Sequence, residues 1–275
     1  MKTIEVKLRT VDDSKLLGVY ADEADCSTVV EEDTLVKCGD RVVLGYVANM
    51  GGDLGTLRSL LSRHKFATGA RGTTKMKGMK TQSSVFGYQP CSELRNKACR
   101  IAGMAVDNAT LHSCLMGWTD SVAKFYRAMA PDAAALPAAE TESKVLDNYQ
   151  IGKTMFTSGI VNKSNRLPYH YDSGNYKGAW SAMLGITDGI DGGYLNVSEY
   201  DLALKISDGS LSFFDGQARI HGVTKFTRQR ADAERYTIVW YSLQKLWNCL
   251  THREEIALMN NRSTLNNRKK SGGTK

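Results

Sequence analysis

The second half of the chain is a close succession of short β-rich segments, and this pattern limits the fold more than any other feature. The segments are TMFTSGIV, PYHYD, AWSAMLGI, GYLNV, LALKIS, SLSFFD, ARIHGV and RYTIVWYS. Turn sequences such as DSGN and TDGIDGG separate them. Many short strands with turns at close spacing are typical of β-sandwiches and barrels. We therefore predict a β-core over residues 150–245.

The first 149 residues carry both strand and helix patterns. IEVKL and RVVLGYV indicate strands, whereas LGTLRSLLSRH (54–64) has apolar residues at helical spacing. The interval from Ser92 to Met129 also has a helical pattern. We therefore expect residues 1–149 to form a strand and helix region packed on the core, which makes the fold class α+β.

Several segments lack periodicity or lie beyond the core. ATGARGTTKMKGMKTQSS (67–84) predicts a long exposed loop, and APDAAALPAA (130–139) predicts a linker-like break. After the core we expect a C-terminal helix over residues 246–260. Residues 261–275 predict a disordered basic tail.

The net charge of +7 is unevenly placed along the chain. The segment Leu54–Pro90 has no Asp or Glu, and neither do the last fifteen residues, NRSTLNNRKKSGGTK. Concentrated basic segments on a near-neutral body favour a polyanionic partner, most simply nucleic acid. The alternative is a solvated loop and a solubilising tail, because charge runs often do nothing specific.

The cysteines and the N-terminus predict a cytoplasmic protein. Six cysteines include no CxxC pair, which favours reduced thiols. The start MKTIEVKLRT has no apolar segment of the kind found in signal peptides, and no apolar run is long enough to cross a bilayer. If the chain is encoded by a bacteriophage, the compartment is the cytoplasm of the bacterial host.

Three residues of the β-core form a candidate metal site. In a strand, residues i and i+2 point to the same side, so His170 and Asp172 aim at one point. His221 lies in another predicted strand. Two histidines and one carboxylate with other positions open are the ligands of non-haem Fe(II) oxygenases. Alone, an H-x-D is usually an ordinary strand end and a single histidine a structural one, but the combination favours a metal site.

Arg235 is the fourth candidate. It lies fourteen residues after His221 and opens the apolar strand RYTIVWYS. An arginine at the start of a buried strand needs a partner, and a dicarboxylate cosubstrate would supply one, because guanidinium holds carboxylates in bidentate fashion. The alternative is a surface ion pair. His64, His112 and His252 lie outside the pattern and are expected to be structural or exposed.

The chain resembles the TET/JBP group of 2-oxoglutarate- and Fe(II)-dependent nucleic-acid base dioxygenases, especially its small phage-type members. The matching stretches are HYDSGNYKGAWSAML, DGGYLNVSEYDLAL, DGSLSFFDGQARIHGVTKF and RYTIVWYS. The basic segment before VFGYQP matches more loosely. The resemblance implies a double-stranded β-helix, or jelly-roll, core. It also implies Fe(II) and 2-oxoglutarate as cofactors, O2 as cosubstrate and ascorbate as a possible reductant.

The resemblance also assigns residues. His170, Asp172 and His221 would be the iron ligands, and Arg235 would bind the distal carboxylate of 2-oxoglutarate. Asn175 matches the asparagine that contacts the target base, and Tyr241 matches an aromatic that stacks on it; the alternatives are a turn residue and a core aromatic. DNA would be the partner. From the placement of the basic residues we expect phosphate contacts from Arg71, Lys75, Lys77 and Lys80, and we expect the enzyme to be a monomer.

The implied reaction is hydroxylation of the 5-methyl group of a pyrimidine in DNA, with 5-methylcytosine preferred and thymine as the alternative. TET proteins have a histidine two residues after the stacking tyrosine, where this chain has Leu243. That departure leaves the choice of base open. Two other readings remain: hydroxylation of a protein side chain or a small molecule, and a non-enzymatic DNA-binding module.

Overall fold

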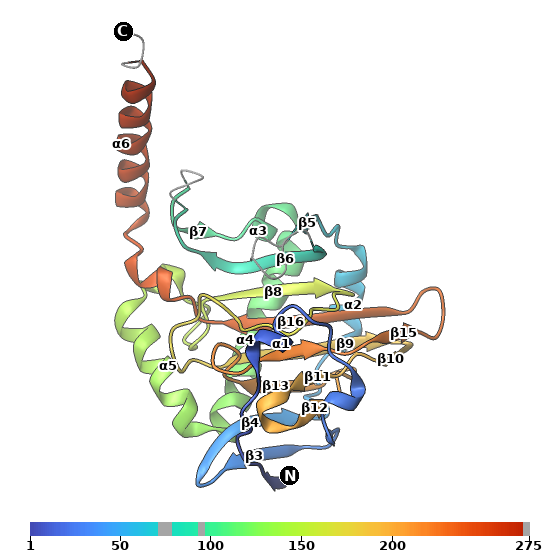
Figure 1. Ribbon diagram of the computed structural model, residues 1–275. Coiled ribbons are helices and arrows are strands. Elements are labelled where there is room, and N and C mark those ends of the chain that lie inside the picture. Colours follow the sequence, from blue (N-terminus) through green and yellow to red (C-terminus); the bar gives the residue numbers. More distant parts are fainter. Residues whose placement is uncertain (71–78, 93–96, 272–275) are drawn as a thin grey trace.

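A large mixed sheet runs through the molecule (Figure 1). The computed structural model describes residues 1–70, 79–92 and 97–271. The strands of this sheet, in spatial order, are β1 (Lys2–Glu5), β3 (Thr34–Cys38), β4 (Arg41–Val47), β13 (Leu211–Phe214), β9 (Ser181–Asp188), β16 (Glu234–Tyr241), β8 (Ser158–Lys163), β6 (Lys80–Gln89) and β5 (Thr68–Ala70), with β7 (Arg100–Ile101) paired to β6.

A smaller sheet packs against one face of the large one. Its strands, in order, are β14 (His221–Val223), β11 (Leu195–Val197), β12 (Leu202–Leu204) and β2 (Thr28–Val30). A separate pair joins β10 (Ile190–Gly192) to β15 (Phe226–Arg228). Leu44 and Phe214 of the large sheet share a buried cluster with Leu195 and Leu204 of the small one. Strands from residues 150–245 contribute to both layers, and strands of the first fifty residues are added to both sheets.

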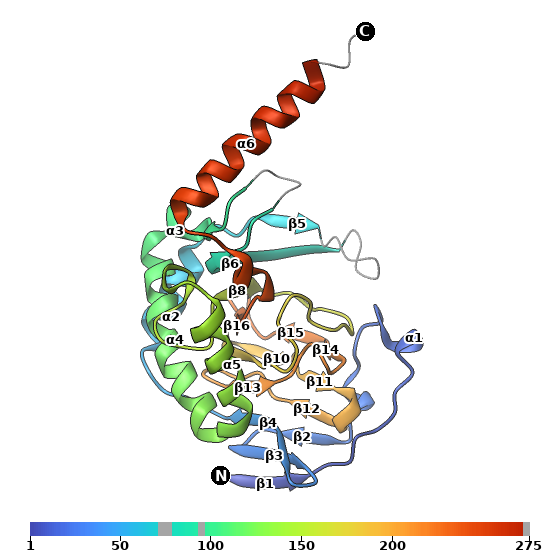
Figure 2. The same ribbon diagram turned by 90° about the vertical axis from the view of Figure 1, so that its left-hand side faces the viewer.

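Helices cover the other face of the large sheet (Figure 2). The helices that contribute to this core are α2 (Leu54–Arg63), α3 (Met104–Asp107), α4 (Ala109–Met129) and α5 (Pro131–Lys144). Helices α1 (Asp13–Leu16) and α6 (His252–Ser271) lie elsewhere, and 3-10 turns occur at Glu23–Asp25, Asp147–Tyr149, Ser198–Tyr200 and Gln244–Asn248. Tyr126 of α4 stacks on Phe213 of β13. Because side chains alternate along a strand, Phe213 faces the helices while Phe214 faces the small sheet.

Strand β16 lies at the centre of this arrangement. It pairs antiparallel with β9 on one side and β8 on the other. Its sequence, ERYTIVWY, is rich in β-branched and aromatic residues, and Tyr236, Ile238 and Trp240 are fully buried in the helix-side core. Arg235, Thr237, Val239 and Tyr241 therefore alternate onto the opposite face, where a cavity lies.

Two segments predicted to be irregular are regular. Part of the predicted loop 67–84 forms β5 and the start of β6, because Ser83 and Ser84 find a ladder along β8 that outweighs their weak strand propensity. The predicted break at 130–139 is wrong, since α5 runs through it. Pro131 occupies the first turn, where its missing N–H costs nothing, and Ala134, Pro137 and Thr141 are buried.

Other expectations are corrected in the same way. The helical pattern from Ser92 is regular helix only from Met104, and PYHYD makes an isolated bridge rather than a strand. The C-terminal helix does not end near residue 260. Helix α6 runs to Ser271 through the segment predicted to be disordered, and it projects away from the body (Figure 1). Among the described residues, no helix combines the length and apolar character needed to cross a membrane.

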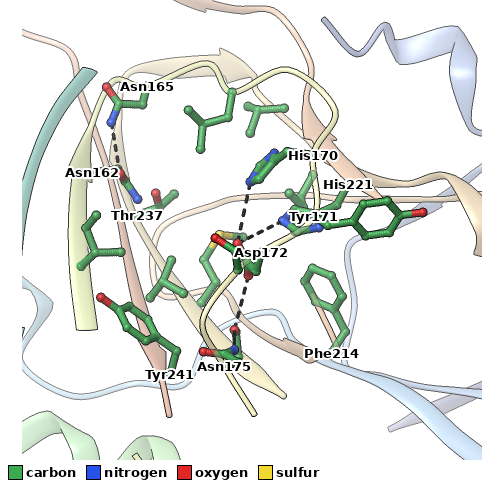
Figure 3. A pocket seen from close by; sticks show the side chains of 18 of the residues that line it. Asn162, Asn165, His170, Tyr171, Asp172, Asn175, Phe214, His221, Thr237 and Tyr241 are labelled. Atoms are coloured by element: carbon green, nitrogen blue, oxygen red, sulfur yellow. Dashed lines mark hydrogen bonds and ion pairs between the residues drawn. The ribbon is translucent and has the colours of Figure 1, made fainter. Parts of the chain in front are cut away.

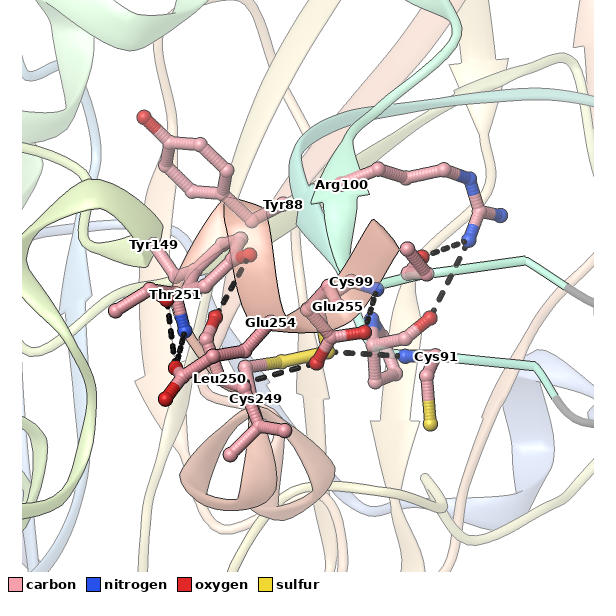
Figure 4. Close-up of a disulfide and its surroundings, with 12 residues drawn as sticks. Tyr88, Cys91, Cys99, Arg100, Tyr149, Cys249, Leu250, Thr251, Glu254 and Glu255 are labelled. Carbon is pink, nitrogen blue, oxygen red and sulfur yellow. Dashed lines mark hydrogen bonds between the residues drawn. A yellow bond between two sulfur atoms is a disulfide. The ribbon is translucent and has the colours of Figure 1, made fainter. Parts of the chain in front are cut away.

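The prediction of reduced thiols is wrong for one pair, because Cys99 and Cys249 form a disulfide (Figure 4). They are 150 residues apart in sequence, so only the tertiary fold brings them together. The buried Glu255 carboxylate accepts hydrogen bonds from the backbone N–H groups of Cys99 and Leu250. The disulfide and Glu255 thus fasten the start of α6 to the segment before β7.

We expect Cys249→Ser to lower the free energy of unfolding by about 2–4 kcal/mol, because the crosslink closes a long loop in the unfolded chain. Urea titrations of the variant and the wild type, each with and without reductant, measure this. Cys38→Ser, at an unpaired cysteine, is the matched control. The expectation is contradicted if the wild type unfolds at the same urea concentration with and without reductant and the native protein has six titratable thiols.

Candidate metal centre

The three candidate ligands come from two neighbouring segments of backbone. His170 and Asp172 lie on residues 168–172, and His221 begins β14. Two backbone hydrogen bonds join His170 and His221: each N–H donates to the other residue's carbonyl oxygen, at 2.9 and 3.0 Å. This bridge fixes the two histidines side by side, with ring centroids 4.4 Å apart.

The side chains converge on one point (Figure 3). Asp172 Oδ1 lies 3.8 Å from Nε2 of His170 and 3.8 Å from Nε2 of His221. One ligand atom from each residue lies within 4.8 Å of the others. Both imidazoles are buried, and the carboxylate is about one third exposed. The prediction that these residues come together is therefore confirmed in geometry.

Backbone carbonyls set the tautomer of both imidazoles. Nδ1 of His170 lies 2.8 Å from the carbonyl oxygen of Pro168, and Nδ1 of His221 lies 2.9 Å from that of Arg219. A carbonyl oxygen only accepts, so Nδ1 carries the proton in each ring. The lone pair of the neutral imidazole is then on Nε2, the atom facing Asp172. Metal-binding histidines are typically oriented by this kind of contact.

The Asp172 carboxylate is held by its surroundings. Its backbone N–H donates to the carbonyl oxygen of Gly216. A Cβ at position 216 would lie 2.5 Å from Asp172 Oδ2, so only glycine leaves room for the carboxylate. The Ser181 hydroxyl donates to Oδ2 at 3.5 Å and accepts from the Asn175 amide at 3.0 Å. Oδ1 is the oxygen left facing the histidines.

Arg235 is buried without a charged partner. Its side chain is 2% exposed, and burial lowers the pKa of its guanidinium to about 10, so it stays charged at neutral pH. Its Nη atoms donate to the carbonyl oxygens of Asn165 and Gly193, and its face lies over the Phe226 ring. Nε makes no hydrogen bond, and no described carboxylate pairs with the group. An unpaired buried charge is costly, which favours an anionic ligand here.

The triad and Arg235 line one cavity of about 220 Å³ between the two sheets. Asn162, Asn165 and Thr237 supply further polar groups beside Arg235, while Met183, Leu195 and Phe214 supply apolar walls. Asn165 donates to Asn162 Oδ1 and exchanges hydrogen bonds with the Gln82 backbone on β6. The cavity wall is thus tied to β6.

The two residues predicted to contact a base also line the cavity. Asn175 is buried, and its backbone forms an isolated bridge with Leu243, which brings it close to the end of β16. Tyr241 is half-buried at that end. Leu243 packs against the cluster of Tyr149 and Leu246, so this position contributes no hydrogen-bonding side chain.

The predicted phosphate contacts are only partly visible. Lys80 begins β6 and is exposed. Arg71, Lys75 and Lys77 lie outside the described residues. His64 and His112 are structural, as predicted: His64 contacts the Ser84 hydroxyl, and His112 Nε2 accepts from the Gly87 N–H. His252 is exposed at the start of α6.

Sequence patterns alone miss Gly216, Ser181, Asn162 and Asn165. Gly216 belongs to the Asp-Gly turn signal Asp215-Gly216, and that signal gives no indication that it adjoins a ligand. The Asn162 and Asn165 side chains face β6, about eighty residues away in sequence. No local pattern indicates such contacts.

The sheets and cavity together define the double-stranded β-helix fold of 2-oxoglutarate- and Fe(II)-dependent oxygenases. A solved structure described as NgTET1 in complex with 5mC DNA has this fold at a TM-score of 0.60, with 14% identity over 85% of this chain and 86% of that one. The family model Tet_JBP, described as the oxygenase domain of the 2OGFeDO superfamily, matches residues 83–244. The chain therefore belongs to the Tet_JBP family of oxygenases.

A curated relative supports the same assignment. Residues of this chain are 28% identical over 119 positions to the bifunctional helicase and thymine dioxygenase JBP2 of Trypanosoma brucei brucei (strain 927/4 GUTat10.1). The match covers 43% of this chain and only 10% of that much longer protein.

Fe(II) and 2-oxoglutarate are the cofactors of the superfamily, and the residues present fit both. Two neutral imidazoles and one carboxylate are a donor set for Fe(II). The buried Arg235, with its unpartnered Nε, fits the distal carboxylate of 2-oxoglutarate.

We expect Arg235→Gln to weaken 2-oxoglutarate binding at least about 30-fold, or about 2 kcal/mol, because a desolvated charge pair is lost. Titration of the metal-loaded protein with 2-oxoglutarate measures this, and metal affinity should stay unchanged. Arg230→Gln is the control, since Arg230 forms exposed ion pairs with Asp188 and Asp232. Equal 2-oxoglutarate affinity in the wild type and Arg235→Gln would contradict the assignment.

Proposed function

We propose that this oxygenase hydroxylates the 5-methyl group of a pyrimidine in DNA, with 5-methylcytosine converted to 5-hydroxymethylcytosine. The observation that carries the proposal is the position of Asn175 and Tyr241. Both line the cavity that also holds the triad and Arg235, and both are the positions that the resemblance matches to base contacts. A base held by these two residues would lie in the same cavity as the triad.

The residues would divide the work as follows. His170, Asp172 and His221 hold the metal, and Arg235 anchors the far end of 2-oxoglutarate. With O2, Fe(II) and 2-oxoglutarate supply the oxidant that replaces a methyl hydrogen by hydroxyl, leaving succinate and CO2. Asn175 and Tyr241 orient the base. The apolar walls at Met183, Leu195 and Phe214 keep water away from the reacting methyl group.

A base inside a duplex cannot reach this cavity, so it must be flipped out at a cost of roughly a few kcal/mol. Phosphate contacts would help offset that cost. The acid-free segment Leu54–Pro90 runs into β6 at Lys80, and Gln82, two residues on, is paired with the cavity-lining Asn165. Lys80 therefore lies two residues along β6 from Gln82, whose backbone pairs with the cavity wall, which supports a role for this segment in DNA binding.

Thymine is the second candidate base. The relative described as a thymine dioxygenase favours it, and Leu243 supplies no hydrogen-bonding side chain beside Tyr241. 5-Methylcytosine and thymine differ at position 4, which is an amino donor or a carbonyl acceptor, and at N3, which is an acceptor or an N–H donor. The Asn175 amide offers both a donor and an acceptor, so it can pair with either base.

We expect the purified protein, given Fe(II), 2-oxoglutarate and ascorbate, to add one oxygen atom to 5-methylcytosine in a duplex. Digestion to nucleosides and mass spectrometry measure the product, with a duplex containing only ordinary thymine and cytosine alongside. His170→Ala/Asp172→Ala is the control and should give no product. If thymidine alone is oxidised, thymine replaces 5-methylcytosine as the proposed substrate base. Turnover of 2-oxoglutarate with neither base oxidised would overturn the DNA proposal.

We expect simultaneous Ala substitution of Arg71, Lys75, Lys77 and Lys80 to weaken DNA binding and to flatten its salt dependence. Each lost phosphate contact reduces the slope of log K against log[salt] by about 0.9. Titrations at several salt concentrations measure both. The matched control substitutes four exposed lysines elsewhere: Lys2, Lys7, Lys124 and Lys205. Unchanged affinity and slope in the first variant would remove this segment from the interface.

A further inference from the structure

We infer that residues 12–25 position the metal ligands, by clamping the outer side of the segment that carries His170 and Asp172. The inference rests on the proposed metal-binding role of the triad, but not on the identity of the substrate. The first part of the chain would then help to position the ligands of a metal site that lies about 150 residues away in sequence.

The clamp completes the backbone pairing of the ligand segment. Residues 168–172 belong to no regular strand, and the isolated bridge to His221 secures one edge. The other edge is paired with the N-terminal segment: Tyr169 N–H donates to the Val19 carbonyl at 2.8 Å, and Gly18 N–H donates to the Tyr169 carbonyl at 2.9 Å. The ligand segment is therefore held from both sides.

Side chains reinforce this pairing. Tyr169 and Tyr171 alternate with the two ligands along the chain. Tyr169 packs in the buried cluster with Ala21 and Ile220, whereas Tyr171 also borders the cavity. Figure 3 shows the Tyr171 ring directed away from Asp172. The Tyr171 hydroxyl donates to Asp13 Oδ2 at 2.9 Å, and the Tyr169 hydroxyl donates to Asp25 Oδ2 at 2.8 Å.

The two aspartates are themselves held in place. Asp13 opens helix α1, which Asp12 caps by accepting from the Ser14 N–H. Asp25 closes a 3-10 turn with a capping box, in which its carboxylate accepts from the Asp22 N–H. Val11, Leu16 and Leu17 pack against the buried cluster of Ala21, Tyr169 and Ile220. The clamp is thus an ordered piece of structure with its own apolar contacts.

The position of this segment matters because it carries two of the three ligands. A shift of residues 168–172 would move His170 and Asp172 together relative to His221. Groups that orient metal ligands typically change metal affinity about 10–100-fold when they are removed. A clamp that only supported the fold would change stability and leave the affinity of the folded protein for metal unaltered.

A double-mutant cycle on Tyr171→Phe and Asp13→Ala tests the inference. The probe is Co(II), titrated anaerobically into the full chain and followed by its visible absorption, with thermal unfolding measured in parallel. We expect each single variant to bind Co(II) about tenfold more weakly. The double variant should bind no more weakly than the weaker single variant, because both remove the same hydrogen bond.

Two controls make the result specific. Tyr236→Phe removes a tyrosine–carboxylate hydrogen bond to Glu234 that faces away from the cavity, and it should leave Co(II) affinity unchanged. His170→Ala should abolish tight binding. Single variants that fold, lose thermal stability and keep Co(II) affinity within twofold of the wild type would overturn the inference. Wild-type affinity in His170→Ala would overturn the triad assignment itself, and no DNA enters either measurement.

Discussion

The pair of backbone hydrogen bonds between His170 and His221 is the contact on which the site depends. It joins two segments fifty-one residues apart and places their imidazoles in contact, so that Asp172 needs only to follow His170 by two positions to complete the triad. One end of the bridge belongs to β14 of the small sheet, so the segment that carries His170 and Asp172 is tied to that sheet.

The cavity is polar at particular positions and apolar between them. This division explains how one small space could accommodate a metal ion, 2-oxoglutarate and the proposed base. Arg235 is buried among carbonyl groups, where only an added anion can balance its charge. The triad offers neutral nitrogen atoms and one carboxylate oxygen. Asn175 is linked to Asp172 through Ser181, so the predicted base contact and a metal ligand share one hydrogen-bonded chain.

The features that could be predicted from the sequence depend on residues that are close together in the chain. The alternation of strands placed His170 and Asp172 on one side, and the position of Arg235 at the start of an apolar strand indicated a buried charge. Gly216, Ser181 and the Cys99–Cys249 disulfide could not be predicted in this way, because their partners are chosen by the packing of distant strands. The helix over 131–144 was missed because Pro131 was read as a break, although a first-turn proline favours a helix start.

The N-terminal segment and the C-terminal helix are both fastened to distant parts of the fold, but by different means. The N-terminal segment uses backbone pairing and tyrosine–aspartate hydrogen bonds on the side of the ligand segment facing away from the metal. The C-terminal helix is attached by the disulfide and Glu255, on the far side of β6. Hydrogen bonds to the backbone that carries the metal ligands fix the geometry of the site, so the N-terminal attachment affects metal binding. A crosslink that closes a loop acts chiefly on the unfolded chain, so the disulfide at the C-terminal helix affects stability.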